Sequence, residues 1–237
     1  MNKGEIDKFI IQLTCKVEDV NKIKLYLYNK YNIDIYSGIL KYSSGKSILL
    51  IYEDKVVKIF PNEYDIEKEI EILKKIDCKY IIKLIDYNCK PNYIIYNRLF
   101  MIETINSKSE FIKQLQHISL ALHQLHKNGY YHDDVFSGNI GLDDNKNYIL
   151  YDFETASKIT STEQMFQDIL MYIEDAIIIY KNKEDILNII NFIYKEILKF
   201  RTVYDKKILF LGKETIRKVY SYSYNLDDFI KIIDNIL

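Results

Sequence analysis

Two carboxylates and one amide lie close together in the middle of the sequence, in a pattern suited to a metal-bound phosphate. Asp134 follows a histidine by two positions, Asn139 follows Asp134 by five, and Asp152 comes directly after the apolar run 148–151. A carboxylate can orient a hydroxyl group and accept its proton. Amide and carboxylate oxygens are hard ligands of the kind that Mg²⁺ prefers. The grouping therefore predicts phosphoryl transfer from a nucleotide bound to Mg²⁺.

The residues around this group predict the elements that hold it in place. A capping pattern at 107–110 opens a helix that ends at Gly129. Its apolar residues fall at steps of four and three, namely Phe111, Leu115, Ile118, Leu122 and Leu125. The segment 143–147, rich in Asp and Asn, predicts the turn of a short hairpin before Asp152. The alternative is a polar loop in which Asp134 and Asn139 only cap the local backbone.

A lysine lies inside an apolar, β-branched run further upstream. The runs 47–52 and 56–60 predict two β-strands joined by the turn 53–55, and Lys58 lies within the second. A buried ammonium group is costly unless it has a partner. A surface lysine on the solvent face of a half-exposed strand is the alternative.

The next segment offers a partner for this lysine. Residues 65–75 contain neither Gly nor Pro and predict a helix. One face of it is apolar, through Ile66, Ile70 and Leu73. Glu69 stands next to that face, and we expect it to pair with Lys58. Glu67 and Glu71 are rival partners, although a run of glutamates on a helix is usually solvated.

Taken together, these residues resemble the protein-kinase-like superfamily. The matching positions of its H-R-D-x-x-x-x-N and D-F-G motifs are His132, Asp134, Asn139 and Asp152. The resemblance implies that Asp134 is the catalytic base and that Asn139 and Asp152 hold Mg²⁺. It also implies that Lys58 grips the phosphates of ATP and pairs with Glu69.

The resemblance further implies where the nucleotide is bound. Ser44, Gly45 and Lys46 lie where the family keeps its glycine-rich loop, and the backbone N–H groups there can cradle phosphate oxygens. The full glycine pattern is absent, and a plain hairpin turn explains these residues equally well. The strand 92–96 leads into an expected adenine-binding hinge, in which Tyr96, Arg98 and Leu99 are the candidate nucleotide contacts.

Several positions depart from ordinary protein kinases. Asp133 replaces the arginine of H-R-D, which in regulated kinases pairs with a phosphorylated activation loop. We therefore do not expect activation-loop phosphorylation to regulate this chain. Phe136 replaces a lysine that is common in serine/threonine kinases. Glu154 replaces the glycine of D-F-G, as in choline kinases and aminoglycoside phosphotransferases. Only 16 residues separate Asp152 from Asp168, which resembles the helix aspartate that supports the catalytic loop. We therefore expect a compact form with no long activation segment.

The implied fold is α+β and two-lobed. We expect a helical extension over 1–36 and a small lobe over 37–103, built from an antiparallel sheet and one main helix. A mostly helical lobe is expected over 104–237, where isoleucines at 186–197 form one apolar face. The implied function is an ATP-dependent phosphotransferase, namely an atypical serine/threonine kinase resembling the RIO and lipopolysaccharide-core kinases. A small-molecule kinase of the choline or aminoglycoside type and a pseudokinase that acts as a binding module are the alternatives.

Composition restricts partners and compartment. The 237 residues carry 33 basic and 34 acidic side chains, a formal charge of −1 that gives no basic field for nucleic acid. We expect a protein or a small hydroxyl-bearing substrate as partner. Three cysteines without metal-like spacing, no signal peptide and no long apolar run predict a cytoplasmic, reducing location without a membrane span. His123 and His126 lack the further ligands that a zinc site requires.

Overall fold

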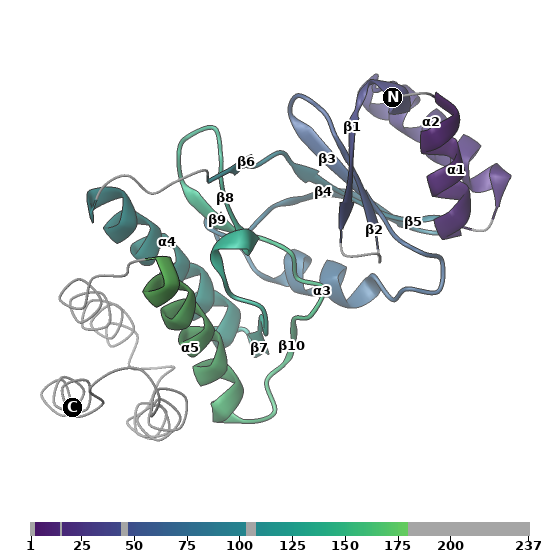
Figure 1. Ribbon diagram of the computed structural model, residues 1–237. Coiled ribbons are helices and arrows are strands. Elements are labelled where there is room, and N and C mark those ends of the chain that lie inside the picture. Colours follow the sequence, from purple (N-terminus) through teal and green to yellow (C-terminus); the bar gives the residue numbers. More distant parts are fainter. Residues whose placement is uncertain (1–2, 15, 44–46, 103–107, 180–237) are drawn as a thin grey trace, which may run out of the picture. The chain divides into compact units, whose positions relative to one another are not determined.

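The computed structural model describes residues 3–14, 16–43, 47–102 and 108–179, which form an α+β structure (Figure 1). The chain divides into two compact units. The first contains residues 1–75 and 82–99, and the second contains residues 76–81 and the chain from Phe100 onward. No helix of the described residues has both the length and the apolar character needed to cross a membrane. The apolar face predicted at 186–197 lies outside the described residues.

The first unit is built on a five-stranded antiparallel sheet. Its strand order is β1-β2-β3-β5-β4, with β1 at Ile39–Ser43, β2 at Ser47–Ile51, β3 at Lys55–Ile59, β4 at Leu84–Cys89 and β5 at Asn92–Asn97. The two strands predicted at 47–52 and 56–60 are confirmed as β2 and β3, which pair antiparallel. Both strands contain β-branched residues, which favour extended backbone.

Helices α1 (Lys3–Thr14) and α2 (Val17–Tyr31) pack on one face of this sheet (Figure 1). They share one hydrophobic core with β2, β3 and β5, which includes Ile10, Ile23, Leu27, Leu50, Val57 and Ile95. Asn32 ends α2 in the left-handed conformation; its N–H group bonds the carbonyl of Tyr28, and the N–H of Ile33 bonds that of Leu27. The short 3₁₀ helix η1 (Ile35–Ser37) then leads into β1. The segment 1–36 is therefore part of the core of the first unit.

Helix α3 (Glu67–Lys75) follows β3 and confirms the helix predicted at 65–75. The Asp65 carboxylate caps it by accepting the N–H of Glu67 at 3.0 Å. Its apolar residues Ile70, Ile72 and Leu73 are buried, together with Glu69. Glu67 and Glu71 are exposed.

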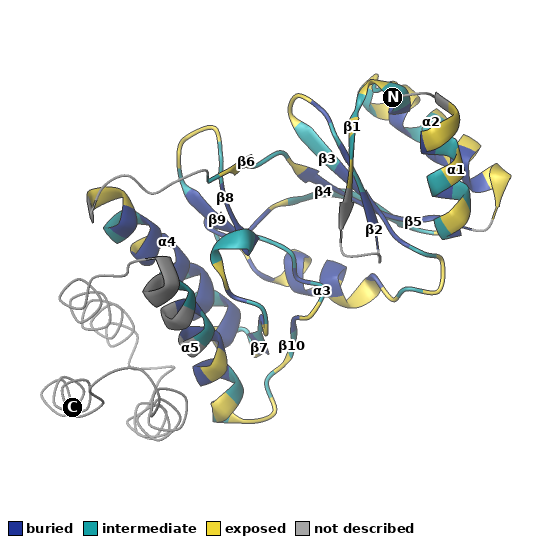
Figure 2. Ribbon diagram, viewed as in Figure 1, coloured by how far each residue is buried: buried dark blue, intermediate teal, exposed yellow. Residues whose placement is uncertain are grey.

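The second unit begins with β6 (Phe100–Met101) and the long helix α4 (Lys108–Lys127). Phe111, Leu115, Ile118, Leu122 and Leu125 are all buried, which confirms the predicted apolar stripe along α4 (Figure 2). Gly129 follows the helix with a φ of 85°, a conformation that favours glycine. The predicted end of this helix is thus confirmed.

The chain after α4 forms short strands and a last described helix. Strand β7 (Tyr130–Tyr131) pairs with β10 (Ser157–Lys158), and β8 (Ile140–Leu142) pairs with both β6 and β9 (Tyr148–Leu150). The predicted hairpin is confirmed as β8–β9, with its turn closed by the Asp143 N–H bonding to the Asn147 carbonyl at 3.0 Å. Helix α5 (Thr162–Ile179) ends the described part. The loop between β7 and β8 carries the candidate site residues.

Candidate active site

The loop 132–139 is attached to helix α5 through one buried carboxylate. Asp168, which is fully buried, accepts the backbone N–H of His132 at 2.8 Å and that of Asp133 at 2.7 Å. His126 Nε2 lies 2.8 Å from the same carboxylate and donates to it. The predicted supporting role of Asp168 is confirmed, and His126 of α4 joins this network.

His132 is a structural residue of the loop. Its ring is fully buried against Phe153, with ring centroids 4.7 Å apart, and Nε2 lies 3.1 Å from the carbonyl oxygen of Tyr151. Burial lowers the pKa of the imidazole, so the ring is neutral and Nε2 carries the proton. The Thr155 hydroxyl donates to the His132 carbonyl at 2.9 Å. His132 thereby ties the loop to the segment that carries Asp152.

Asp134 and Asn139 lie in direct contact. Asn139 Nδ2 donates to the Asp134 carboxylate at 2.8 Å and to the Asp134 carbonyl at 2.9 Å. Both partners are acceptors, so the amide must present its nitrogen to them and Oδ1 must face away. The side-chain Oδ1 of Asn139 can thus serve as a ligand, while Nδ2 orients the carboxylate of Asp134. The structure brings these two predicted site residues together.

Asp152 follows β9 in a strained conformation. Its φ is 65°, and Asp133 has the same φ of 65°. Positive φ is unfavourable for residues with a Cβ, and such strain concentrates at functional sites. The Tyr151 N–H next to Asp152 donates to the Asn139 carbonyl at 3.0 Å. This bond links the chain segments of the two expected metal ligands, and their oxygens are the donor set that Mg²⁺ prefers.

Phe136 presents a partly exposed aromatic ring on the same loop. The ring is 39% exposed and lies over Gly138, where an added Cβ would meet a ring carbon at 2.2 Å. Only glycine fits beneath the ring in this arrangement. The loop therefore carries an apolar surface two positions after Asp134.

In the first unit, Lys58 and Glu69 are both buried, with exposures of 4% and 3%. Lys58 faces Ile94 across the β3–β5 ladder, and Val56 faces Tyr96. Residues paired across strands or two apart along a strand share a face of the sheet. Lys58 and Tyr96 therefore share a face, and the Tyr96 hydroxyl donates to Glu69 Oε1 at 2.6 Å. Glu69 thus lies over the face that carries Lys58.

Two of the expected nucleotide contacts, Tyr96 and Arg98, also bond residues within the first unit. The Tyr96 hydroxyl donates to Glu69, and the Tyr96 backbone pairs with Val56 and Leu84 in the sheet. The Arg98 N–H donates to the Asp54 carbonyl at 2.9 Å, and its guanidinium donates to the Tyr52 carbonyl at 3.1 Å. Arg98 therefore bonds the turn between β2 and β3. Leu99 is half-buried.

The expected phosphate-binding residues Ser44, Gly45 and Lys46 lie outside the described residues. Gly38, seven positions before Gly45, has a packing role. A Cβ at Gly38 would lie 2.9 Å from the ring of Tyr52. Gly38 is therefore explained by the close approach of that ring.

One residue of the site was missed by the sequence analysis. Asp175 of α5 accepts the backbone N–H of Ser137 at 2.7 Å and its hydroxyl at 3.2 Å. Burial raises the pKa of this carboxyl, and the two bonds from Ser137 oppose that effect. The available signal was spacing, because Asp175 stands seven residues after Asp168 and hence on the same helix face.

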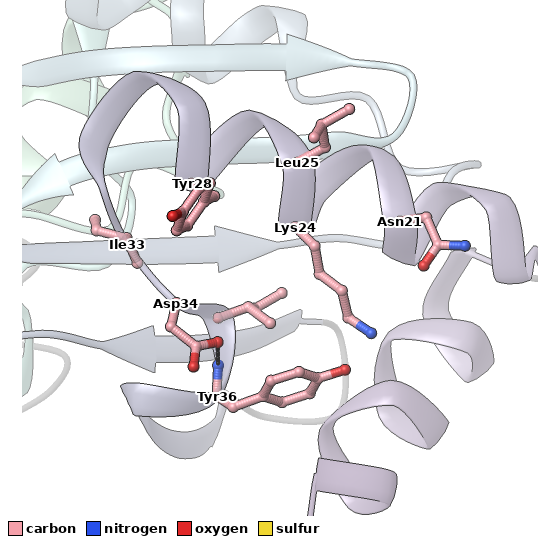
Figure 3. A pocket seen from close by; sticks show the side chains of 8 residues that line it. Asn21, Lys24, Leu25, Tyr28, Ile33, Asp34 and Tyr36 are labelled. Carbon is pink, nitrogen blue, oxygen red and sulfur yellow. Dashed lines mark hydrogen bonds between the residues drawn. The ribbon is translucent and has the colours of Figure 1, made fainter.

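A hollow of about 360 Å³ lies elsewhere on the first unit, between α2 and the segment 33–36 (Figure 3). Its wall is largely apolar, through Leu25, Tyr28, Ile33 and Ile35. Lys24 pairs with Asp7 at 2.8 Å, and the Asp34 carboxylate caps the Tyr36 N–H at 3.0 Å. The polar groups beside this hollow therefore serve the local structure, which leaves the loop 132–139 as the better candidate for chemistry.

Comparison of the sequence with protein-family models finds no match, and comparison with curated proteins finds none either.

Proposed function

We propose that this chain is an ATP-dependent phosphotransferase with a two-lobed, protein-kinase-like fold of compact, atypical form. The observation that carries the proposal is the loop 132–139. Asp168 fixes the start of the loop, and Asn139 orients the Asp134 carboxylate within it. Positioned carboxylates of this kind are what a loose phosphoryl transition state requires, because it needs orientation more than strong basicity.

Each residue has a defined role in this proposal. Asp134 orients the acceptor hydroxyl and takes up its proton. Asn139, through Oδ1, and Asp152, through its carboxylate, hold Mg²⁺, which neutralises charge on the phosphates when bound. Lys58 grips the phosphates of ATP, and Glu69 positions Lys58. Burial of both Lys58 and Glu69 supports this assignment, since buried charged groups need partners.

The acceptor is proposed to be a serine or threonine hydroxyl of a protein, with a small alcohol as the second candidate. Glu154 favours the second candidate, because it gives the Asp-Phe-Glu ending of choline and aminoglycoside kinases. Incubation with labelled ATP and separate panels of proteins and small hydroxyl compounds, including aminoglycosides, tests both. Label on the protein panel alone supports the first candidate, and label on the small compounds alone replaces it with the second.

A pseudokinase is the remaining alternative, and Asp133 and the incomplete glycine pattern favour it. A thermal-shift titration with Mg²⁺·ATP measures whether the folded chain binds the nucleotide. A ligand that binds only the folded state stabilises it by about 2.7 kcal/mol at a hundredfold excess over Kd. Stabilisation with no turnover on either panel would indicate a pseudokinase, and no shift at millimolar nucleotide would contradict nucleotide binding altogether.

A further inference from the structure

Helix α5 holds the loop 132–139 at two points. Asp168 bonds the N–H groups of His132 and Asp133, and Asp175 bonds both the N–H and the hydroxyl of Ser137. Seven residues separate the two aspartates, so both carboxylates project from one face of α5. The candidate base Asp134 lies in the chain between the two attachment points.

The carboxylate of Asp175 supplies an acceptor that the Ser137 N–H does not have within its own helix. Ser137 is the first residue of the 3₁₀ helix η2 (Ser137–Asn139), so its N–H has no partner within that helix. Phe136 before it is extended, with φ −148° and ψ 171°. A carboxylate acceptor gives a stronger bond to such an N–H than a neutral acceptor does. Asp175 thereby fixes where η2 begins.

The start of η2 determines the position of Asn139. The Asn139 N–H donates to the Phe136 carbonyl at 2.9 Å, and this bond closes η2. Asn139 Nδ2 then donates to Asp134, and the backbone carbonyl of Asn139 accepts the N–H of Tyr151. A shift of Ser137 is therefore passed to the carboxylate of Asp134 and to the strand end that carries Asp152.

We propose that Asp175 is a positioning residue, which holds η2 so that Asn139 can orient Asp134 and bind the metal ion. The effect on turnover rests on the proposed phosphotransferase function. The effect on the loop does not, because it follows from the hydrogen bonds to Ser137.

The experiment measures the loop and the activity separately in the full chain. Amide hydrogen exchange at Ser137 is compared among the wild type, Asp175→Ala, Asp175→Asn and the control Gln167→Ala, which alters an exposed residue of α5. We expect exchange at Ser137 to be about tenfold or more faster in Asp175→Ala, because its N–H loses its acceptor. Asp175→Asn keeps an acceptor oxygen and should recover part of the protection. Gln167→Ala should match the wild type.

Turnover and its dependence on Mg²⁺ are measured on the same variants. We expect Asp175→Ala to lower kcat by about tenfold or more and to raise the Mg²⁺ concentration needed for half-maximal rate, because Asn139 is displaced. A merely destabilised fold would lower Tm without moving the Mg²⁺ dependence. Ser137→Pro removes the same N–H, and proline suits the first residue of a helix. Asp175→Ala should therefore have little further effect on kcat in the Ser137→Pro background.

Unchanged exchange at Ser137 in Asp175→Ala would overturn the inference at its structural step. Faster exchange with unchanged kcat and Mg²⁺ dependence would overturn its functional step and leave the phosphotransferase in place. No turnover in the wild type would overturn the proposed function, while the exchange data would still decide whether Asp175 holds the loop.

Discussion

The loop 132–139 donates a few specific hydrogen bonds to two carboxylates of α5, whereas Lys58 and Glu69 are buried on one face of a five-stranded sheet. The loop depends on two carboxylates that each bond backbone N–H groups. On the sheet face, Glu69 and Lys58 lie among buried side chains, and Glu69 accepts the hydroxyl of Tyr96. A single change should therefore disturb the loop strongly, while the sheet should keep its fold when one site residue is altered.

The largest effect is expected at Asp152. Asp152→Asn removes the negative charge that this expected Mg²⁺ ligand contributes, and turnover should fall below detection. The side chain is only half-buried, so unfolding by heat should shift little. Asp144→Asn, at the exposed tip of the β8–β9 turn, is the matched control and should keep full activity. Wild-type turnover of Asp152→Asn in Mg²⁺ would show that this position holds no metal.

Variants at Lys58 and Glu69 test the residues that are buried on the five-stranded sheet. Lys58→Met should lower turnover by several orders of magnitude, because the phosphates lose their cation, and should leave the sheet folded. Glu69→Gln should lower turnover more than Glu67→Gln, since Glu69 is buried over the face of Lys58 and Glu67 is exposed. Kinetics of the three variants, with circular dichroism as the check on folding, measure this. Equal effects at 67 and 69 would contradict the assigned partner.

Asp168 should govern the stability of the loop. Asp168→Ala leaves the buried His132 N–H, the partly buried Asp133 N–H and His126 without their acceptor, so we expect a loss of about 3–5 kcal/mol in the free energy of unfolding. Denaturant unfolding followed by fluorescence or circular dichroism measures it. Gln167→Ala, the exposed neighbour, should cost less than about 0.5 kcal/mol. A small loss in Asp168→Ala would mean that the loop is held by other contacts.

A smaller effect is expected from pH through His117 of α4. Burial lowers its pKa from 6.5 to about 4, and Nδ1 accepts the Tyr148 N–H at 3.1 Å. Below pH 6.5 the unfolded chain binds a proton that the folded chain binds only near pH 4. The free energy of unfolding should therefore fall by roughly 1–3 kcal/mol as the pH drops through this range.

The variant His117→Gln checks this origin of the acid sensitivity. Its side-chain oxygen can still accept the Tyr148 N–H, but it does not titrate. Denaturation of both proteins between pH 7 and pH 4 should show a shallower decline in the variant. Parallel declines would assign the acid sensitivity to other groups, such as His132, whose pKa is also lowered by burial.

The elements that carry the site could be predicted from sequence because each has a local signal. The apolar, β-branched run around Lys58, the apolar stripe of α4 and the Asp-rich turn 143–147 correctly predicted the strands, the helix and the hairpin. Asp175 was missed because its spacing from Asp168 places it on the same face of α5 but does not show which loop residue it meets. The packing of 1–36 was left open for the same reason, since an amphipathic helix does not specify its partner.

Within the site, the sequence identified residue types better than it identified contacts. Asp134 and Asn139 are close in the chain, so their contact follows from the motif spacing. Tyr96 was expected to contribute to a nucleotide-binding hinge, yet its hydroxyl bonds Glu69. That bond joins β5 to α3 across 27 residues of sequence, and it required the register of the sheet to be known.

The most direct test of the central claim separates nucleotide binding from phosphoryl transfer at Asp134. Asp134→Asn keeps an oxygen to accept the Asn139 amide, so the loop should remain in place. We expect Mg²⁺·ATP affinity, measured by calorimetry, to stay near the wild-type value, because Asn139 and Asp152 hold the metal. Transfer to the hydroxyl acceptor should fall by about 10²–10⁴-fold, the contribution of a positioned acid–base group. Loss of binding and transfer together in a folded variant would contradict the role assigned to Asp134.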